Sequence, residues 1–94
     1  MRDDVIAARF ADVNSATAAI DWFTNQALPE GALRIFTQLP NAKPRAPRAG
    51  DSARSDVSWI VAVDLERARI PKADVLATIR REGGAVLSEV PSGI

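Results

Sequence analysis

Two acidic side chains, Asp64 and Glu66, stand two positions apart at the end of an apolar stretch. Carboxylates at this spacing can share one face of a strand end, where they can serve acid–base catalysis or hold Mg²⁺. The alternative role is structural, with solvated acids that end a strand and pair with Arg67 or Arg69. The chain has no histidine and no cysteine, so the commonest general base and metal ligand is absent, as is any thiolate nucleophile. We therefore predict a non-enzymatic protein with no catalytic residue, no metal site and no cofactor.

A basic segment is the second group of residues with chemical potential. Four cations stand against the single acid Asp51 between positions 41 and 55, which gives a local charge of +3: Lys43, Arg45, Arg48 and Arg54. These side chains could contact phosphates of a nucleic acid, or they could belong to a solvated linker. The spacing of Pro44 and Pro47 also fits a minimal PxxP ligand for an SH3-like groove.

The region around these cations, residues 39–55, has three prolines and few large apolar side chains. Such a segment gains little from burial to offset the entropy of ordering, so we predict a mobile loop. The remaining chain alternates between strand-like and helix-like apolar patterns. The predicted elements are strands at 5–10, 32–38, 56–64 and 85–90, and helices at 15–26 and 71–81.

The stretch 56–64 organises the rest of the chain. It is rich in β-branched and aromatic residues, and it contains neither glycine nor proline. Both of its alternating sets are apolar, with Trp59, Val61 and Val63 on one side and Ile60 and Ala62 on the other. A strand that is apolar on both sides is normally covered on both sides, so we place it centrally in a sheet.

The order of elements predicts one domain over residues 1–94. Two strand–helix–strand halves with right-handed crossovers give an antiparallel four-stranded sheet with both helices on one face, the ferredoxin-like βαββαβ sandwich. The strands at 5–10 and 56–64 are then central.

Two helices shelter only one face of such a sheet, so apolar side chains of the central strand remain on the other. We assign Trp59, Val61 and Val63 to this open face, with the reverse assignment left open. At roughly 25 cal/mol per Å², exposing these side chains forgoes several kcal/mol, which is typical of a contact surface. We expect homodimerisation or a protein partner on this face, unless the C-terminal tail or the long loop covers it.

Composition argues against several other classes of protein. Twelve acidic and twelve basic residues balance to zero formal charge, which is unlike a dedicated DNA-binding protein. RNA-recognition modules share the expected topology, but here Phe10 and Trp59 are the only aromatic residues on the two central strands. Nucleic-acid binding through the basic loop is therefore the alternative function. No stretch suits a membrane span, and we expect a cytoplasmic protein.

The chain resembles small bacterial general stress proteins of the heat-induced YflT type. The similar stretches are the strand and acidic cap at 5–12, the alanine-rich helix at 16–27, the turn at 28–33, the strand at 59–64 and the helix end at 80–84. Many members of that family have a Gly-rich insertion where this chain is rich in proline and arginine. The resemblance implies a stress-linked, non-enzymatic role and brings no catalytic residues.

Overall fold

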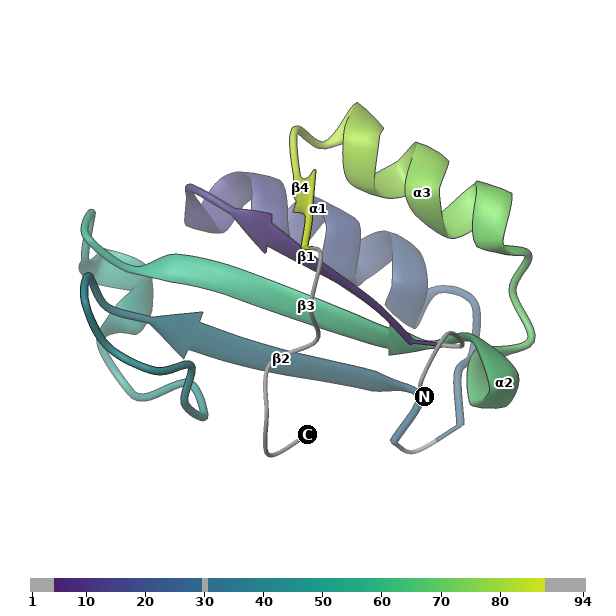
Figure 1. The fold of residues 1–94 in the computed structure, drawn as a ribbon, viewed down its shortest axis with the longest axis horizontal. Helices are drawn as coiled ribbons and strands as arrows, with labels where there is room; N and C mark the ends of the chain where they lie inside the picture. Colours follow the sequence, from purple (N-terminus) through teal and green to yellow (C-terminus); the bar gives the residue numbers. More distant parts are fainter. Residues whose placement is uncertain (1–4, 30, 88–94) are drawn as a thin grey trace.

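The computed structural model describes residues 5–29 and 31–87. The elements are β1 (Val5–Phe10), α1 (Val13–Thr24), β2 (Leu33–Gln38), the 3-10 helix η1 (Asp51–Ala53), β3 (Ser58–Asp64), α2 (Leu65–Ala68), α3 (Lys72–Arg81) and β4 (Ala85–Val86). The four strands form one antiparallel sheet in the order β2-β3-β1-β4 (Figure 1). The mixed α+β class with a four-stranded antiparallel sheet is therefore confirmed.

Strand β3 lies in the middle of the sheet, as its two apolar sides predict. It pairs with β1 on one edge and with β2 on the other, and the register places Trp59 opposite Phe10 and Val61 opposite Ala8. Because directly opposed residues point to the same face of a sheet, this register decides which side chains of β3 and β1 lie together.

Helix α1 begins where the sequence offers a capping residue. The Asp12 side chain accepts a hydrogen bond of 2.8 Å from the Ser15 backbone N–H, which satisfies one of the unpaired donors of the first turn. The buried stripe of the helix consists of Ala16, Ala19 and Phe23. Its two small residues allow the helix to lie close to the sheet, and Phe23 fills the space beyond them.

Helix α3 buries Val75 and Ile79 and ends at Arg81, where the predicted helix at 71–81 also ends, just before two glycines. Gly83 has a φ of 82°, a left-handed conformation that side chains disfavour. Gly84 lies against the core, since an added Cβ there would be 2.6 Å from Cε2 of Phe10. The strand that follows is shorter than predicted within the described chain, and positions 88–90 of the predicted strand lie outside the described residues.

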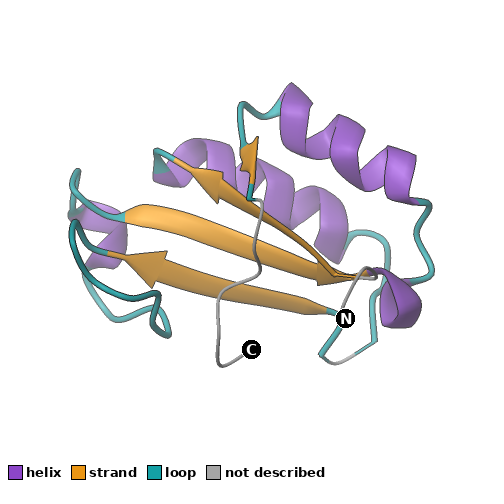
Figure 2. Cartoon of the chain, viewed as in Figure 1, coloured by secondary structure: helices purple, strands orange, loops and turns teal. Residues whose placement is uncertain are grey.

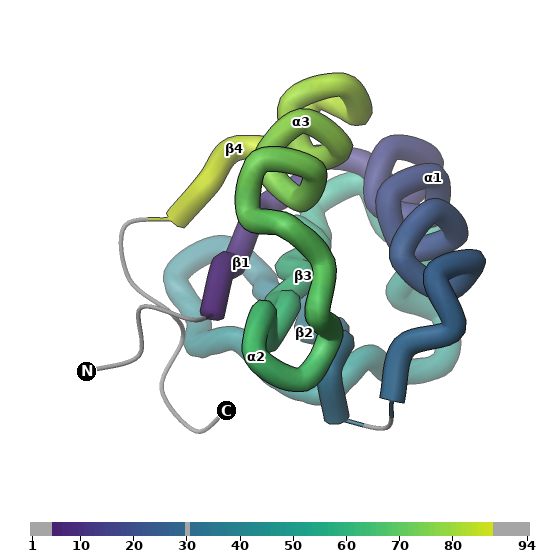
Figure 3. The backbone as a smooth tube through the Cα atoms, turned by 90° about the vertical axis from the view of Figure 1, so that its right-hand side faces the viewer, coloured from purple at the N-terminus to yellow at the C-terminus, as the bar shows by residue number. Residues whose placement is uncertain are grey.

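Helices α1 and α3 pack on the same face of the sheet (Figures 2 and 3). The core between them joins sheet and helix side chains: Ile6, Ala8, Phe10, Val61 and Val63 from the sheet, with Ala16, Ala19, Phe23, Val75 and Ile79 from the helices. Trp59 is partly buried and packs against this cluster. The open-face assignment of Trp59, Val61 and Val63 is thus corrected, because the register puts them beside Phe10, Ala8 and Ile6 under the helices.

The face of the sheet opposite α1 and α3 has its own small apolar cluster. Ala7, Ile60 and Ala62 are only 1–2% exposed, and Val5, Phe36 and Leu87 are partly buried against them. Among the described residues, Val86 is the one large hydrophobic side chain that is exposed, at 46%. The second apolar side of β3 is therefore sealed rather than exposed, contrary to the expectation of a large open apolar face.

Candidate functional site: the helix-free sheet face and the loop beside it

The loop between β2 and β3 gathers at one end of the sheet, at the opposite end from α2 (Figure 1). Part of it adds to the sheet, because Thr37 and Arg45 exchange two backbone hydrogen bonds of 2.8 Å on the outer edge of β2. In this antiparallel register, Pro47 would stand opposite Ile35. Since proline has no N–H to donate, pairing cannot continue in that direction.

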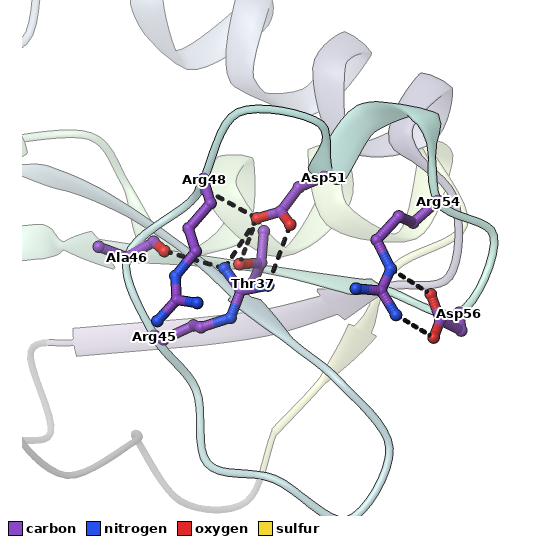
Figure 4. A network of polar contacts seen from close by, with 7 residues as sticks. All are labelled: Thr37, Arg45, Ala46, Arg48, Asp51, Arg54 and Asp56. Atoms are coloured by element: carbon purple, nitrogen blue, oxygen red, sulfur yellow. Dashed lines mark hydrogen bonds and ion pairs between the residues drawn. The ribbon is translucent and has the colours of Figure 1, made fainter.

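Asp51 is the centre of a polar network that holds the loop (Figure 4). Its two carboxylate oxygens accept 3.0 Å hydrogen bonds from the two Nη atoms of Arg45. Oδ2 also accepts from the Thr37 hydroxyl at 2.9 Å and from the Arg48 backbone N–H at 2.8 Å. These polar contacts anchor the loop at Asp51, while its predicted mobility beyond them stays a prediction.

The electrostatics of Asp51 follow from these partners. The Arg45 guanidinium, the Arg48 N–H and the Thr37 hydroxyl hold the pKa of this carboxyl far below its usual range. The residue is only 3% exposed, so an ionised carboxylate here depends on that set of donors. Asp51 is consequently a structural anion that fixes the loop against β2.

A second pair forms nearby between Arg54 and Asp56. The guanidinium donates two hydrogen bonds, of 2.9 Å from Nε and 2.7 Å from Nη2, to the two carboxylate oxygens. The Arg54 hydrogen bonds lower the pKa of Asp56, and the same contacts raise the pKa of Arg54. Both side chains stay about half exposed, so solvent screens this pair.

The four cations of the predicted basic site therefore differ in whether they form an ion pair. Arg45 and Arg54 are each engaged with an aspartate of the loop, which leaves less charge for phosphates than the sequence suggests. Lys43 and Arg48 have exposed side chains, and Arg48 contributes its backbone N–H to Asp51.

Two arginines that sequence reasoning did not select stand on the helix-free face. Arg9 of β1 and Arg34 of β2 are exposed, and the register places Arg9 in the row of the half-buried Phe36 and Arg34 in the neighbouring row. Arg9 and Phe36 both pair with Ile60, so they lie in the same row on either side of it. The alternating pattern of β1 could have predicted the exposure of Arg9, because Arg9 falls on the side opposite Ile6, Ala8 and Phe10.

A hollow of about 340 Å³ opens at the end of this face beside Arg9. Residues of β1, β2 and β3 and of the loop line it: Arg9, Gln38, Leu39, Pro40, Asn41, Asp56 and Ser58. Arg9 Nη2 donates a 3.1 Å hydrogen bond to Gln38 Oε1, and Gln38 Nε2 donates one of 2.7 Å to the Ala42 carbonyl. The hollow is thus polar and carries a positioned guanidinium.

In the candidate carboxylate pair of Asp64 and Glu66, Asp64 has a structural role. Asp64 caps α2, accepting hydrogen bonds from the backbone N–H groups of Glu66 at 3.1 Å and Arg67 at 3.3 Å. The expected pairing with Arg67 is confirmed, with 3.6 Å between Arg67 Nε and Asp64 Oδ2. The side chain of Asp64 thus points to the start of α2, where it acts as the N-cap.

Within residues 5–29 and 31–87, no group of three or more acidic, histidine or cysteine side chains could hold a metal ion. In the same part of the chain, no helix has the length and apolar character needed to cross a membrane. No protein-family model matches the chain, and no curated protein and no solved structure shows significant similarity to it.

Proposed function

We propose that this chain is a small non-enzymatic association domain with the ferredoxin-like βαββαβ architecture. Two features support the architecture: strands and the helices α1 and α3 alternate as β-α-β-β-α-β, and β1 and β3 are the central strands. The short helices α2 and η1 are additions to that plan. In this proposal the helix-free face of the sheet is the contact surface for a protein partner.

One observation carries the proposal. The face away from α1 and α3 presents the exposed side chains of Arg9 and Arg34 together with the partly buried Phe36. Arginine and aromatic residues are both enriched at protein interfaces. Arginine also binds carboxylates in a bidentate manner, which favours an acidic partner surface.

Charge also indicates whether the partner on this face is a second copy of the chain or a different protein. In a symmetric dimer through this face, the arginines of both copies would be brought near one another, and like charges at an interface are unfavourable. The sealed apolar cluster also offers a second copy little to bury. We therefore favour an acidic protein partner, and homodimerisation through the same face is the other form of the proposal.

The test combines solution mass with capture of a partner. The partner is isolated with the wild-type chain from the native cells, identified, and purified for direct binding measurements. Arg34→Glu should weaken that binding at least about tenfold, equivalent to about 1.4 kcal/mol. Lys72→Glu, which reverses an exposed charge on α3, is the matched control and should leave the affinity unchanged.

The outcomes separate the alternatives. Equal loss with Arg34→Glu and Lys72→Glu would point to unspecific attraction and contradict the proposed face. A concentration-dependent mass and melting temperature would favour the homodimer. Binding to arbitrary nucleic acid that falls steeply with salt, and that needs Lys43 and Arg48, would favour the nucleic-acid alternative.

The biological setting is a further part of the proposal. The resemblance to bacterial general stress proteins of the YflT type supports a stress-linked role in the cytoplasm. Protein abundance that stays constant after heat shock and other stresses in the source cells would contradict that role.

A further inference from the structure

The hollow beside Arg9 has the features of a binding site for a small anion. Its volume of about 340 Å³ falls within the range of small-molecule pockets, at the lower end. Three strands and one loop contribute to its walls, so the sheet fixes the relative positions of the lining groups.

Arg9 is held in place by a relay of two hydrogen bonds. Gln38 Oε1 accepts a hydrogen bond from the Arg9 guanidinium, and Gln38 Nε2 donates one to the Ala42 carbonyl. Both ends of the side-chain amide are therefore hydrogen-bonded. A guanidinium has five N–H donors, and the bond to Gln38 uses one of them. The others remain available to a ligand that enters the hollow.

The charge balance of the hollow favours an anion. Its carboxylate, Asp56, is engaged by two hydrogen bonds from Arg54, and this pairing compensates its negative charge. Arg9 has no ion pair with an acidic residue in the described part of the chain. The local sum is therefore one net positive charge, contributed by Arg9.

Neutral hydrogen-bond donors complete the lining. Ser58 on the β3 side and Asn41 on the loop side both line the hollow, and they carry a hydroxyl and a side-chain amide respectively. Oxyanions are bound in proteins by such combinations of one guanidinium with hydroxyl and amide donors.

We propose that this hollow binds the oxyanion of a small molecule, a phosphate or a carboxylate, with Arg9 as the principal ligand-binding residue. Gln38 is a positioning residue, because it orients the guanidinium from the side facing the loop. The proposal goes beyond the partner-binding role, and it holds whether or not a protein docks on the rest of the face.

The experiment is a titration of the full-length protein, at low ionic strength and constant pH, followed by amide NMR shifts. The probes are inorganic phosphate, acetate and a short oligothymidylate, each compared with chloride at matched ionic strength. We expect saturable shifts that centre on Gln38, Asn41 and Ser58, with dissociation constants for the small anions in the millimolar range.

Three variants test the assignment. Arg9→Gln should weaken binding at least tenfold, which corresponds to about 1.4 kcal/mol. Gln38→Leu should weaken it less, and Lys72→Gln, an exposed cation on α3, should leave it unchanged. The melting temperature of each variant verifies its fold, and Arg9 is exposed, so its substitution leaves the core intact.

The probes distinguish the sources of the anion. Binding of phosphate or acetate alone assigns the site to a small ligand, whereas a much tighter oligothymidylate complex that also needs Arg9 identifies the anion as a nucleic-acid phosphate. Shifts that do not saturate, or an Arg9→Gln variant that binds as the wild type does, would overturn the proposal. Loss of partner capture in Arg34→Glu concerns a different residue, so failure of one proposal leaves the other testable.

Discussion

The hydroxyl of Thr37 donates a hydrogen bond of 2.9 Å to Oδ2 of Asp51 across fourteen residues of sequence. Thr37 is completely buried in β2, and Asp51 opens the 3-10 helix η1 in the loop. This bond joins the outer strand of the sheet to the segment that the sequence marks as irregular. The loop is therefore part of the folded structure at this point.

Replacing Thr37 by valine tests this connection. The substitution keeps the shape of the side chain but removes the hydroxyl, so Asp51 loses one of its donors. We expect a loss of about 1 kcal/mol in the free energy of unfolding, measured by urea denaturation. Thr17→Val on the exposed side of α1 is the control and should change stability little. Equal effects at both sites would contradict an anchoring role for Thr37.

Asp51 should also make stability depend on pH. Its pKa is lowered in the folded protein relative to the value of 3.8 for an unperturbed carboxyl, so the folded state favours the ionised form. The resulting stabilisation is fully present above pH 3.8 and is lost as the pH falls toward the lower, folded pKa. Asp51→Asn should lower the melting temperature near neutral pH and flatten its decline in acid.

The control for that measurement is Asp21→Asn, an exposed acid on α1. It should leave the acid decline close to that of the wild type. A decline in Asp51→Asn as steep as in the wild type would show that other carboxyls, such as Asp12 and Asp56, dominate the acid sensitivity.

The two adjacent glycines after α3 should respond differently to alanine. At Gly84 the new Cβ would lie 2.6 Å from Cε2 of Phe10 and 3.0 Å from Cγ2 of Ile79, inside the core. At Gly83 the Cβ would meet nothing within 4 Å, and the cost comes from its φ of 82°. We expect losses of about 3 kcal/mol for Gly84→Ala and about 1 kcal/mol for Gly83→Ala.

A double variant identifies the source of the larger loss. Adding Phe10→Leu to Gly84→Ala should cost less than the sum of the two single changes, because the smaller side chain relieves the overlap. Strict additivity in urea unfolding would exclude the contact with Phe10 as the cause.

The corrected position of the aromatic and valine side chains of β3 gives a fourth prediction. Val63→Ala should lower the free energy of unfolding by about 2 kcal/mol, since Val63 is fully buried between sheet and helices. Val86→Ala is the control on an exposed valine and should cost less than about 0.5 kcal/mol.

Trp59→Ser belongs to the same test. Because Trp59 packs against the helix-side core, we expect a lower melting temperature and an unchanged solution mass for the folded protein. A folded variant of wild-type stability with a smaller solution mass would instead place Trp59 at an interface between copies.

The sequence predicted those features that depend on neighbours along the chain. The helix-like apolar pattern at 15–26 predicted α1, and the capping role of Asp12 follows from its position before that pattern. The double-sided apolar stretch of β3 predicted its central place, and the helix predicted at 71–81 ends where α3 ends. Each of these signals arises within a few residues.

The faces of β3 could not be assigned in this way. Both of its sides are apolar, so periodicity alone does not say which side meets the helices. The answer comes from the register with β1, which pairs Arg9 with Ile60 and Phe10 with Trp59. Arg9 stays exposed on the helix-free side, and the large ring of Phe10 is buried on the other.

The candidate site likewise depends on residues that are distant in sequence. The cations between positions 41 and 55 are conspicuous in the sequence, but whether each is free depends on where Asp51 and Asp56 lie in space. Arg9 meets Gln38 only because β3 lies between their strands and sets both registers. Local chemistry along the chain thus determined the elements and their order, whereas strand pairing, a contact between distant segments, decided which faces and charges the protein presents.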